Sequence, residues 1–115
     1  MSFAQLSTPF AIYVFTTDAN PYTVVNPGRA FRIVSIEAQN NNNAATRTVT
    51  ITDAAGNAIA ATAAPLAALS QTWLYCNTTL NSTLIDAGEN LIVQSNGVGM
   101  TVVLYCTANP MLALT

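Results

Sequence analysis

The sequence predicts an all-β protein, an antiparallel β-sandwich or jelly-roll-like domain of about seven or eight short strands. Runs rich in Val, Ile, Thr, Tyr and Phe recur at intervals of about 8–12 residues, which is typical of small sandwiches. Motifs rich in Asn, Asp, Pro and Gly separate these runs. No segment shows the periodicity of an amphipathic helix, so a βαβ architecture is not expected.

In the first half of the chain, the predicted strands span residues 10–17, 22–25, 30–39 and 46–52. In the third strand the polar side changes from Arg32 to Ser35 and Glu37, which predicts a β-bulge near Ile33 and Val34. A polar loop tip is expected over residues 40–43. The fourth strand should place its threonines on one face and Arg47, Val49 and Ile51 on the other.

In the second half, the predicted strands span residues 58–64, 70–76, 91–95 and 100–107. Residues 53–57 should form a tight hairpin in which Gly56 adopts a positive φ. A second hairpin is expected over residues 96–99, and residues 84–90 should form a turn that leads into the next strand. Residues 65–69 are predicted to form at most one helical turn.

The length of 115 residues predicts a single domain. We expect an N-terminal arm over residues 1–9, a sandwich over 10–109 and a C-terminal tail over 110–115. Apolar residues make up 51% of the chain and charged residues only 7%, whereas 19 Ala, 16 Thr and 12 Asn supply 47 residues. Such a surface suits coverage by other protein, although a charge-poor secreted or extremophile domain is an alternative.

The ionisable side chains exclude several classes of function. With three arginines, no lysine and a net charge of −2, neither nucleic-acid nor membrane binding is expected. Without histidine or lysine, no general base activates a Ser, Thr or Cys nucleophile, so we predict neither an enzyme nor a cofactor. Asp86 and Glu89 are interpreted as a solvated turn rather than a catalytic carboxylate pair. Asp53 and Asn57 offer too few carboxylates for calcium.

The two cysteines, Cys76 and Cys106, are predicted to be buried thiols. They lack a CxxC spacing, and residues 1–9 lack the basic and apolar regions of a secretory signal. Trp73 and Tyr75 share one face of their strand and, with Tyr105, have two interpretations. They could stack on sugar rings, as in a carbohydrate-binding module, but we favour packing in the core.

The segment from Asp86 to Gly97, followed by the strand from Met100 to Cys106, is similar to the closing strands of small β-sandwich virion proteins. Together with its Ala/Thr/Asn composition, the chain resembles the cement (decoration) proteins of tailed bacteriophage heads. The resemblance implies a non-enzymatic protein, made in the host cytoplasm and often trimeric, that clamps the major capsid protein on the outer surface of the virion. It assigns no binding residue.

The two terminal segments are the candidate partner-binding regions. Their side chains could lie along a neighbouring subunit or cap the sandwich of their own chain. The candidate residues are Phe3, Leu6, Pro9, Met111, Leu112 and Leu114. The alternative function is a carbohydrate- or receptor-binding β module of a phage tail or of a secreted protein.

Overall fold

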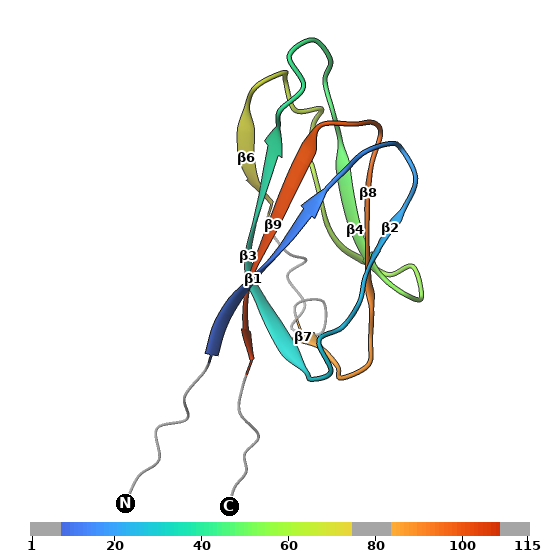
Figure 1. The fold of residues 1–115 in the computed structure, drawn as a ribbon, viewed down its shortest axis with the longest axis vertical. Helices are drawn as coiled ribbons and strands as arrows, with labels where there is room; N and C mark the ends of the chain where they lie inside the picture. Colours follow the sequence, from blue (N-terminus) through green and yellow to red (C-terminus); the bar gives the residue numbers. More distant parts are fainter. Residues whose placement is uncertain (1–7, 75–83, 109–115) are drawn as a thin grey trace, which may run out of the picture.

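The computed structural model describes residues 8–74 and 84–108, and within them the chain is all-β (Figure 1). None of the described residues forms a helix that is long and apolar enough to cross a membrane. The strands are β1 (Thr8–Phe15), β2 (Tyr22–Val24), β3 (Phe31–Asn40), β4 (Val49–Asp53), β5 (Ala58–Ala61), β6 (Gln71–Leu74), β7 (Leu84–Ile85), β8 (Leu91–Ser95) and β9 (Met100–Ala108).

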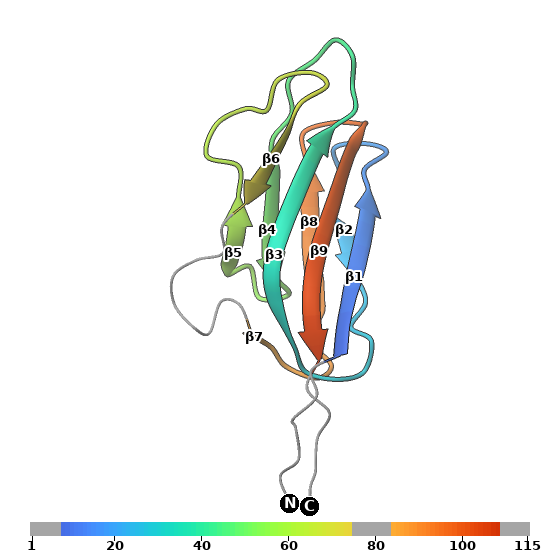
Figure 2. The same ribbon diagram turned by 90° about the vertical axis from the view of Figure 1, so that its left-hand side faces the viewer.

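These strands form two antiparallel sheets that pack face to face, which confirms the predicted sandwich (Figure 2). The five-stranded sheet has the order β1-β9-β3-β6, and β7 pairs with the start of β3. The four-stranded sheet has the order β2-β8-β4-β5. The lower end of the sandwich in both figures is where β1 begins and β9 ends, and there Thr8 pairs with Ala108.

The core lies between the two sheets and is almost entirely aliphatic. Alternate residues of each strand point into it, as Ile36 and Ala38 of β3 and Val102 and Leu104 of β9 illustrate. Phe31 is its large aromatic, and Phe10 contacts the Phe31 ring edge-on at a centroid distance of 5.5 Å. The predicted alternation along residues 46–52 has Val49 and Ile51 on one face, where both are fully buried, and Thr50 on the other face, where it is exposed.

The predicted bulge is present on β3. The register of β3 against β9 shifts between Ile33 and Ser35, which leaves Val34 without a paired residue and 62% exposed. The bulge explains the change of phase in the sequence, because the inward positions are Phe31 and Ile33 before it and Ile36 and Ala38 after it.

Residues 65–69 form no helical turn, which agrees with the prediction of at most one: Leu66 makes a bridge to Arg47, and Leu69 has a φ of 57°. Two local predictions were wrong. Residues 84–85, predicted as part of a turn, form the short strand β7. Asn40 is no loop-tip residue: it ends β3 with 1% of its surface exposed, and its amide donates to the carbonyl oxygens of Ala45, Leu66 and Ala67.

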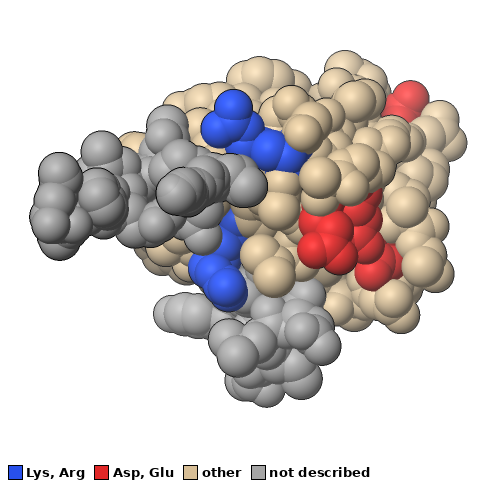
Figure 3. Space-filling view, turned by 90° about the horizontal axis from the view of Figure 1, so that it is seen from below, with Lys and Arg blue, Asp and Glu red and all other residues tan. Residues whose placement is uncertain are grey.

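Side-chain caps close the turns at the lower end. The Asn26 carboxamide accepts from the amides of Gly28 and Arg29 and donates to the carbonyls of Asp86 and Glu89, so it ties two turns together. Five of the eight charged residues, Arg29, Arg32, Asp53, Asp86 and Glu89, belong to this end. Figure 3 views it from below and shows the basic and the acidic groups on separate parts of the surface.

Candidate functional site: an aromatic face on the five-stranded sheet

The outer surface of the five-stranded sheet carries aromatic side chains from three strands. Cross-strand pairing places Tyr13 of β1 beside Val103 of β9, and Val103 beside Glu37 of β3. Glu37 in turn pairs with Trp73 of β6. We call the following six residues the aromatic face: Tyr13, Phe15, Glu37, Trp73, Val103 and Tyr105. The strand register alone therefore assembles a continuous surface from residues far apart in the sequence.

The rings of the aromatic face are open to solvent. The exposed fraction is 59% for Tyr13, 64% for Phe15 and 51% for Trp73. Trp73 and Tyr105 lie side by side, with ring centroids 6.0 Å apart and planes inclined at 43°. Isolated exposed apolar residues are ordinary, but several rings on one sheet surface are typical of a binding site.

The predicted core position of Trp73 is therefore wrong. Alternation along β6 gives the inward position to Leu74, which is buried opposite Ile36, whereas Trp73 lies opposite Glu37 on the outer surface. Residues 72–75 allow either phase, and the prediction placed the larger pair of side chains inside. Tyr75, the other half of that pair, lies outside the described residues.

A carboxylate lies at the centre of the aromatic face. One oxygen of Glu37, Oε1, accepts a hydrogen bond from Nε2 of Gln39 at 3.2 Å and a long one from the Tyr105 hydroxyl at 3.5 Å. The pKa of Tyr105 lies above its ordinary value because the phenol is partly removed from water and because the negative charge of Glu37 disfavours the phenolate. Tyr105 therefore remains a neutral hydrogen-bond donor beyond the usual range of pH.

A row of polar side chains runs beside the aromatic row. Thr101 of β9 pairs with Gln39 of β3, and Gln39 pairs with Gln71 of β6. The Thr101 hydroxyl accepts a hydrogen bond of 2.8 Å from the Asn41 carboxamide. Uncharged donors and acceptors thus border the rings on the side nearer the upper end of the sandwich.

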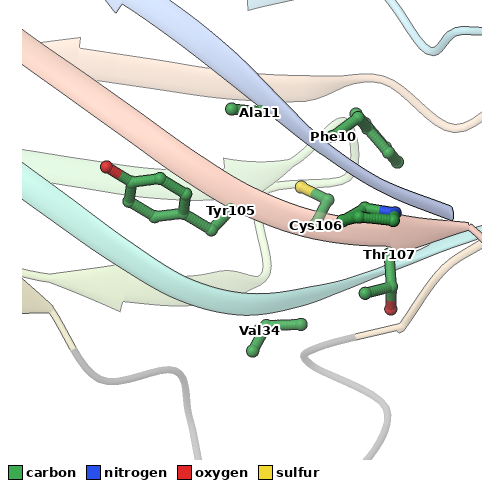
Figure 4. A pocket seen from close by; sticks show the side chains of 7 residues that line it. Phe10, Ala11, Val34, Tyr105, Cys106 and Thr107 are labelled. Atoms are coloured by element: carbon green, nitrogen blue, oxygen red, sulfur yellow. The ribbon is translucent and has the colours of Figure 1, made fainter. Parts of the chain in front are cut away.

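Below the rings, the β3 bulge creates a shallow apolar depression of about 370 Å³. Pro9 and Ala11 of β1, Val34 of β3 and Tyr105 of β9 are among the residues that line it (Figure 4). Val34 and Tyr105 approach it from neighbouring strands, so Tyr105 borders both the depression and the aromatic face. Val103 is only 2% exposed although it points outward, because the larger side chains around it cover it.

Most of the predicted partner-binding residues cannot be placed. Phe3, Leu6, Met111, Leu112 and Leu114 lie outside the described residues. Pro9, predicted at the end of the arm, is exposed within β1 and pairs with Thr107.

The two acidic turns have the predicted structural role. The Glu89 carboxylate accepts a hydrogen bond of 3.2 Å from the backbone amide of Asp86. Asp53 accepts hydrogen bonds from the side chain and the backbone amide of Asn57, and these bonds lower the pKa of Asp53. Gly56 completes this hairpin with a φ of 92°, as predicted. Within the described ranges, no group of three or more potential ligands is placed to hold a metal ion.

Cys106 is buried, and its Sγ atom lies 3.5 Å from the carbonyl oxygen of Leu104. Cys76 lies outside the described residues. The predicted thiol state of the two cysteines therefore stays a prediction.

Sequence reasoning missed Tyr13, Phe15 and Glu37 as site residues. The signal was present in residues 10–15, which are apolar without interruption. A strand at the surface of a two-layer sandwich needs apolar side chains on one face only, so the second set of Ala11, Tyr13 and Phe15 called for a separate explanation. Glu37 gave no such signal, because only the cross-strand pairing reveals its neighbours.

The chain matches no known protein-family model, and no curated protein shows significant sequence similarity to it.

Proposed function

We propose that the protein is a structural, non-enzymatic component of a virus particle. In this proposal it is a cement protein that binds the major capsid protein on the outer surface of an assembled phage head. It attaches through its two terminal segments and acts as a small cyclic oligomer such as a trimer. Symmetric copies on a symmetric shell increase the total affinity without new kinds of contact.

The observation that supports this proposal most directly is the pairing of Thr8 with Ala108. Paired residues of antiparallel strands lie about 5 Å apart, so the two terminal segments leave the sandwich from neighbouring points at its lower end. Together these segments contain Phe3, Leu6, Met111, Leu112 and Leu114, and they contain no charged residue. In this proposal the two segments act together as one apolar attachment site.

The scarcity of charge supports attachment by apolar contacts and backbone hydrogen bonds. Only eight charged side chains are present in the whole chain. Several of them stabilise turns: Asp53 and Glu89 accept backbone hydrogen bonds, and Arg47 donates from Nε to the carbonyl of Val98 at 2.9 Å. Few charges remain for ion pairs with a partner.

Sedimentation of phage heads across a salt series tests the proposal. The screening length falls from about 10 Å at 0.1 M salt to about 3 Å at 1 M, which weakens surface ion pairs but not apolar contacts. The bound copies, counted by gel densitometry, should therefore stay on the heads in 1 M sodium chloride.

Deletion of residues 1–7 spares β1 and should release the protein more readily than the matched double variant Arg29→Gln/Arg47→Gln. Urea denaturation of the deletion variant establishes that it is folded. Release of the intact protein at a few tenths molar salt would show that ion pairs hold it. Failure of the folded, intact protein to sediment with heads under any condition would refute the function itself.

A further inference from the structure

The aromatic face combines flat apolar rings with hydrogen-bonding side chains, and few classes of ligand interact well with both. Its rings at Tyr13, Phe15 and Trp73 are half or more exposed and offer flat apolar surface. The carboxylate of Glu37 and the side chains of Gln39, Gln71 and Thr101 lie within or next to the ring row and offer hydrogen bonds. A pyranose sugar has this composition, since one side of its ring is lined by C–H groups and its edge carries hydroxyls.

The negative charge of Glu37 limits which class of ligand can cover the aromatic face. Covering Glu37 removes a carboxylate from water, which is costly unless donors replace the lost hydration. A carboxylate accepts up to about four hydrogen bonds, and Gln39 and Tyr105 supply two of them to Oε1. Sugar hydroxyls can supply the others without adding charge. An acidic sugar would bring a second negative charge close to Glu37, and the two carboxylates would repel each other.

A second copy of the chain is a less suitable occupant of the aromatic face, because its own Glu37 is also negative. A two-fold contact centred on the aromatic face would oppose the Glu37 carboxylates of the two copies. The other charged side chain that β3 directs outward, Arg32, lies at the lower end, where it pairs with Thr107 and Leu84. Uncharged polyhydroxyl ligands avoid this repulsion.

The width of the site indicates the size of the ligand. Tyr13 and Trp73 stand on the first and last strands of the order β1-β9-β3-β6, three strand spacings apart. Three spacings amount to about 14 Å, which exceeds the width of one pyranose ring. We propose that the aromatic face is a binding site for a neutral oligosaccharide, whose rings stack on Tyr13, Phe15 and Trp73 and whose hydroxyls hydrogen-bond to Glu37 and Gln39.

This site does not depend on the proposed attachment to a capsid. Thr8 and Ala108 pair at the lower end of the sandwich, whereas the strands that carry the aromatic face, β1, β9, β3 and β6, run along its side (Figure 2). Binding of oligosaccharides to the isolated full-length protein can therefore be measured separately from binding to heads.

The chain contains one tryptophan, so emission excited at a wavelength that tyrosine does not absorb reports Trp73. The experiment titrates the full-length protein with neutral oligosaccharides of glucose, galactose, mannose or N-acetylglucosamine, and with oligogalacturonate as the acidic counterpart. At least one neutral oligosaccharide should produce a saturable change in emission, and oligogalacturonate should bind at least about tenfold more weakly.

Three variants test whether the aromatic face is the binding site. Tyr13→Ala keeps Trp73 as the reporter and should weaken binding about tenfold, because exposed rings buried by a ligand contribute most of its binding free energy. Glu37→Gln keeps the shape of the side chain and should reduce the discrimination against the acidic oligosaccharide. Thr50→Ala, on the outer face of the other sheet, is the matched control and should bind as the unchanged protein does.

The alternative outcomes have separate meanings. If no neutral oligosaccharide binds, or if Tyr13→Ala binds as tightly as the control, the aromatic face is not a sugar site. If Tyr13→Ala instead dissociates the oligomer in light scattering, or releases the protein from heads, the aromatic face is a protein interface and the proposal is overturned. Loss of head binding on deletion of residues 1–7, with sugar binding retained, separates the two proposals.

Discussion

The outer faces of the two sheets share the same strand geometry but carry different side chains. On the four-stranded sheet, Thr23, Thr50, Thr52, Ile92 and Gln94 point outward, and we call this surface the threonine face. On the five-stranded sheet, the corresponding positions hold the rings of the aromatic face. The threonine face has no charged residue among these five, whereas the aromatic face has Glu37 at its centre.

The comparison of the two outer faces shows which surface residues the sandwich fold itself explains. Threonine is β-branched and suits a strand that is half exposed to water, so the threonine face follows from strand propensity alone. Exposed tryptophan, tyrosine and phenylalanine also favour strands, but they leave large apolar surfaces in contact with water. These surfaces are what the proposed ligand would cover, and the threonine face provides a natural reference surface for testing them.

The largest expected effect on stability distinguishes the inward and outward faces of β9. Leu104 is fully buried between the sheets, and Leu104→Ala should lower the free energy of unfolding by about 2–5 kcal/mol. Val103 faces outward but is only 2% exposed. Because Val103→Ala removes two buried carbon groups, it should cost about 1.6 kcal/mol.

Thr50→Ala on the threonine face should change the free energy of unfolding by no more than about 0.5 kcal/mol. Urea denaturation of the three variants measures these differences. If Val103→Ala were as neutral as Thr50→Ala, the rings of the aromatic face would not shield Val103, and the two outer faces would be equivalent in stability.

Much of the fold was predictable because its signals are local. Turn motifs such as Asp53 to Asn57 fix where strands end, and alternation fixes which side of β4 is buried. The bulge near Val34 was predictable because it changes the phase of the polar residues along a single strand. The burial of Asn40 was not predictable. The three carbonyls that its amide contacts belong to two loops, and only the tertiary structure brings them together.

The candidate site was less predictable than the fold. Its residues come from four strands, and no short motif contains more than one or two of them. The sequence identified Trp73 as a possible sugar-stacking residue. Which side of β6 it faces depends on the pairing with β3, which places Leu74 opposite Ile36 in the core. A long apolar run can show that a strand is apolar on both faces, but it cannot show which carboxylate lies among the rings.

Replacing an exposed ring should have a smaller effect on stability than replacing a core residue. Trp73→Thr gives the aromatic face the residue type of the threonine face, and it removes the ring contact with Tyr105. Such contacts contribute about 0.5–1.5 kcal/mol, so the free energy of unfolding should fall by about 1 kcal/mol. A core tryptophan would cost about 3–5 kcal/mol, and a loss of that size in urea denaturation would mean that Trp73 is packed as a core residue after all.

The smallest expected effects are pH dependences of opposite sign on the two sheets. Asp53, in the β4–β5 hairpin of the four-stranded sheet, has a pKa below the ordinary 3.8 because the Asn57 side chain and backbone hydrogen-bond to its carboxylate. Its contribution to stability is present above that ordinary pKa and is lost as the pH falls through the lower folded value. Tyr105 has a pKa above the ordinary 10.0 because of desolvation and the nearby charge of Glu37. Its contribution is present below pH 10.0 and is lost as the pH rises through the higher folded value.

Urea midpoints measured across the pH range should therefore separate the two groups. Asp53→Asn should reduce the loss of stability at acid pH without altering the alkaline limb, and Tyr105→Phe should do the reverse. Glu37→Gln extends the comparison, because removing the charge beside Tyr105 should bring the Tyr105 pKa closer to its ordinary value and so diminish the alkaline loss. If Glu37→Gln left the alkaline limb unchanged while Tyr105→Phe reduced it, desolvation and the neighbouring Tyr13 would account for the raised pKa of Tyr105. The carboxylate at the centre of the aromatic face would then be too well solvated to act on its neighbours.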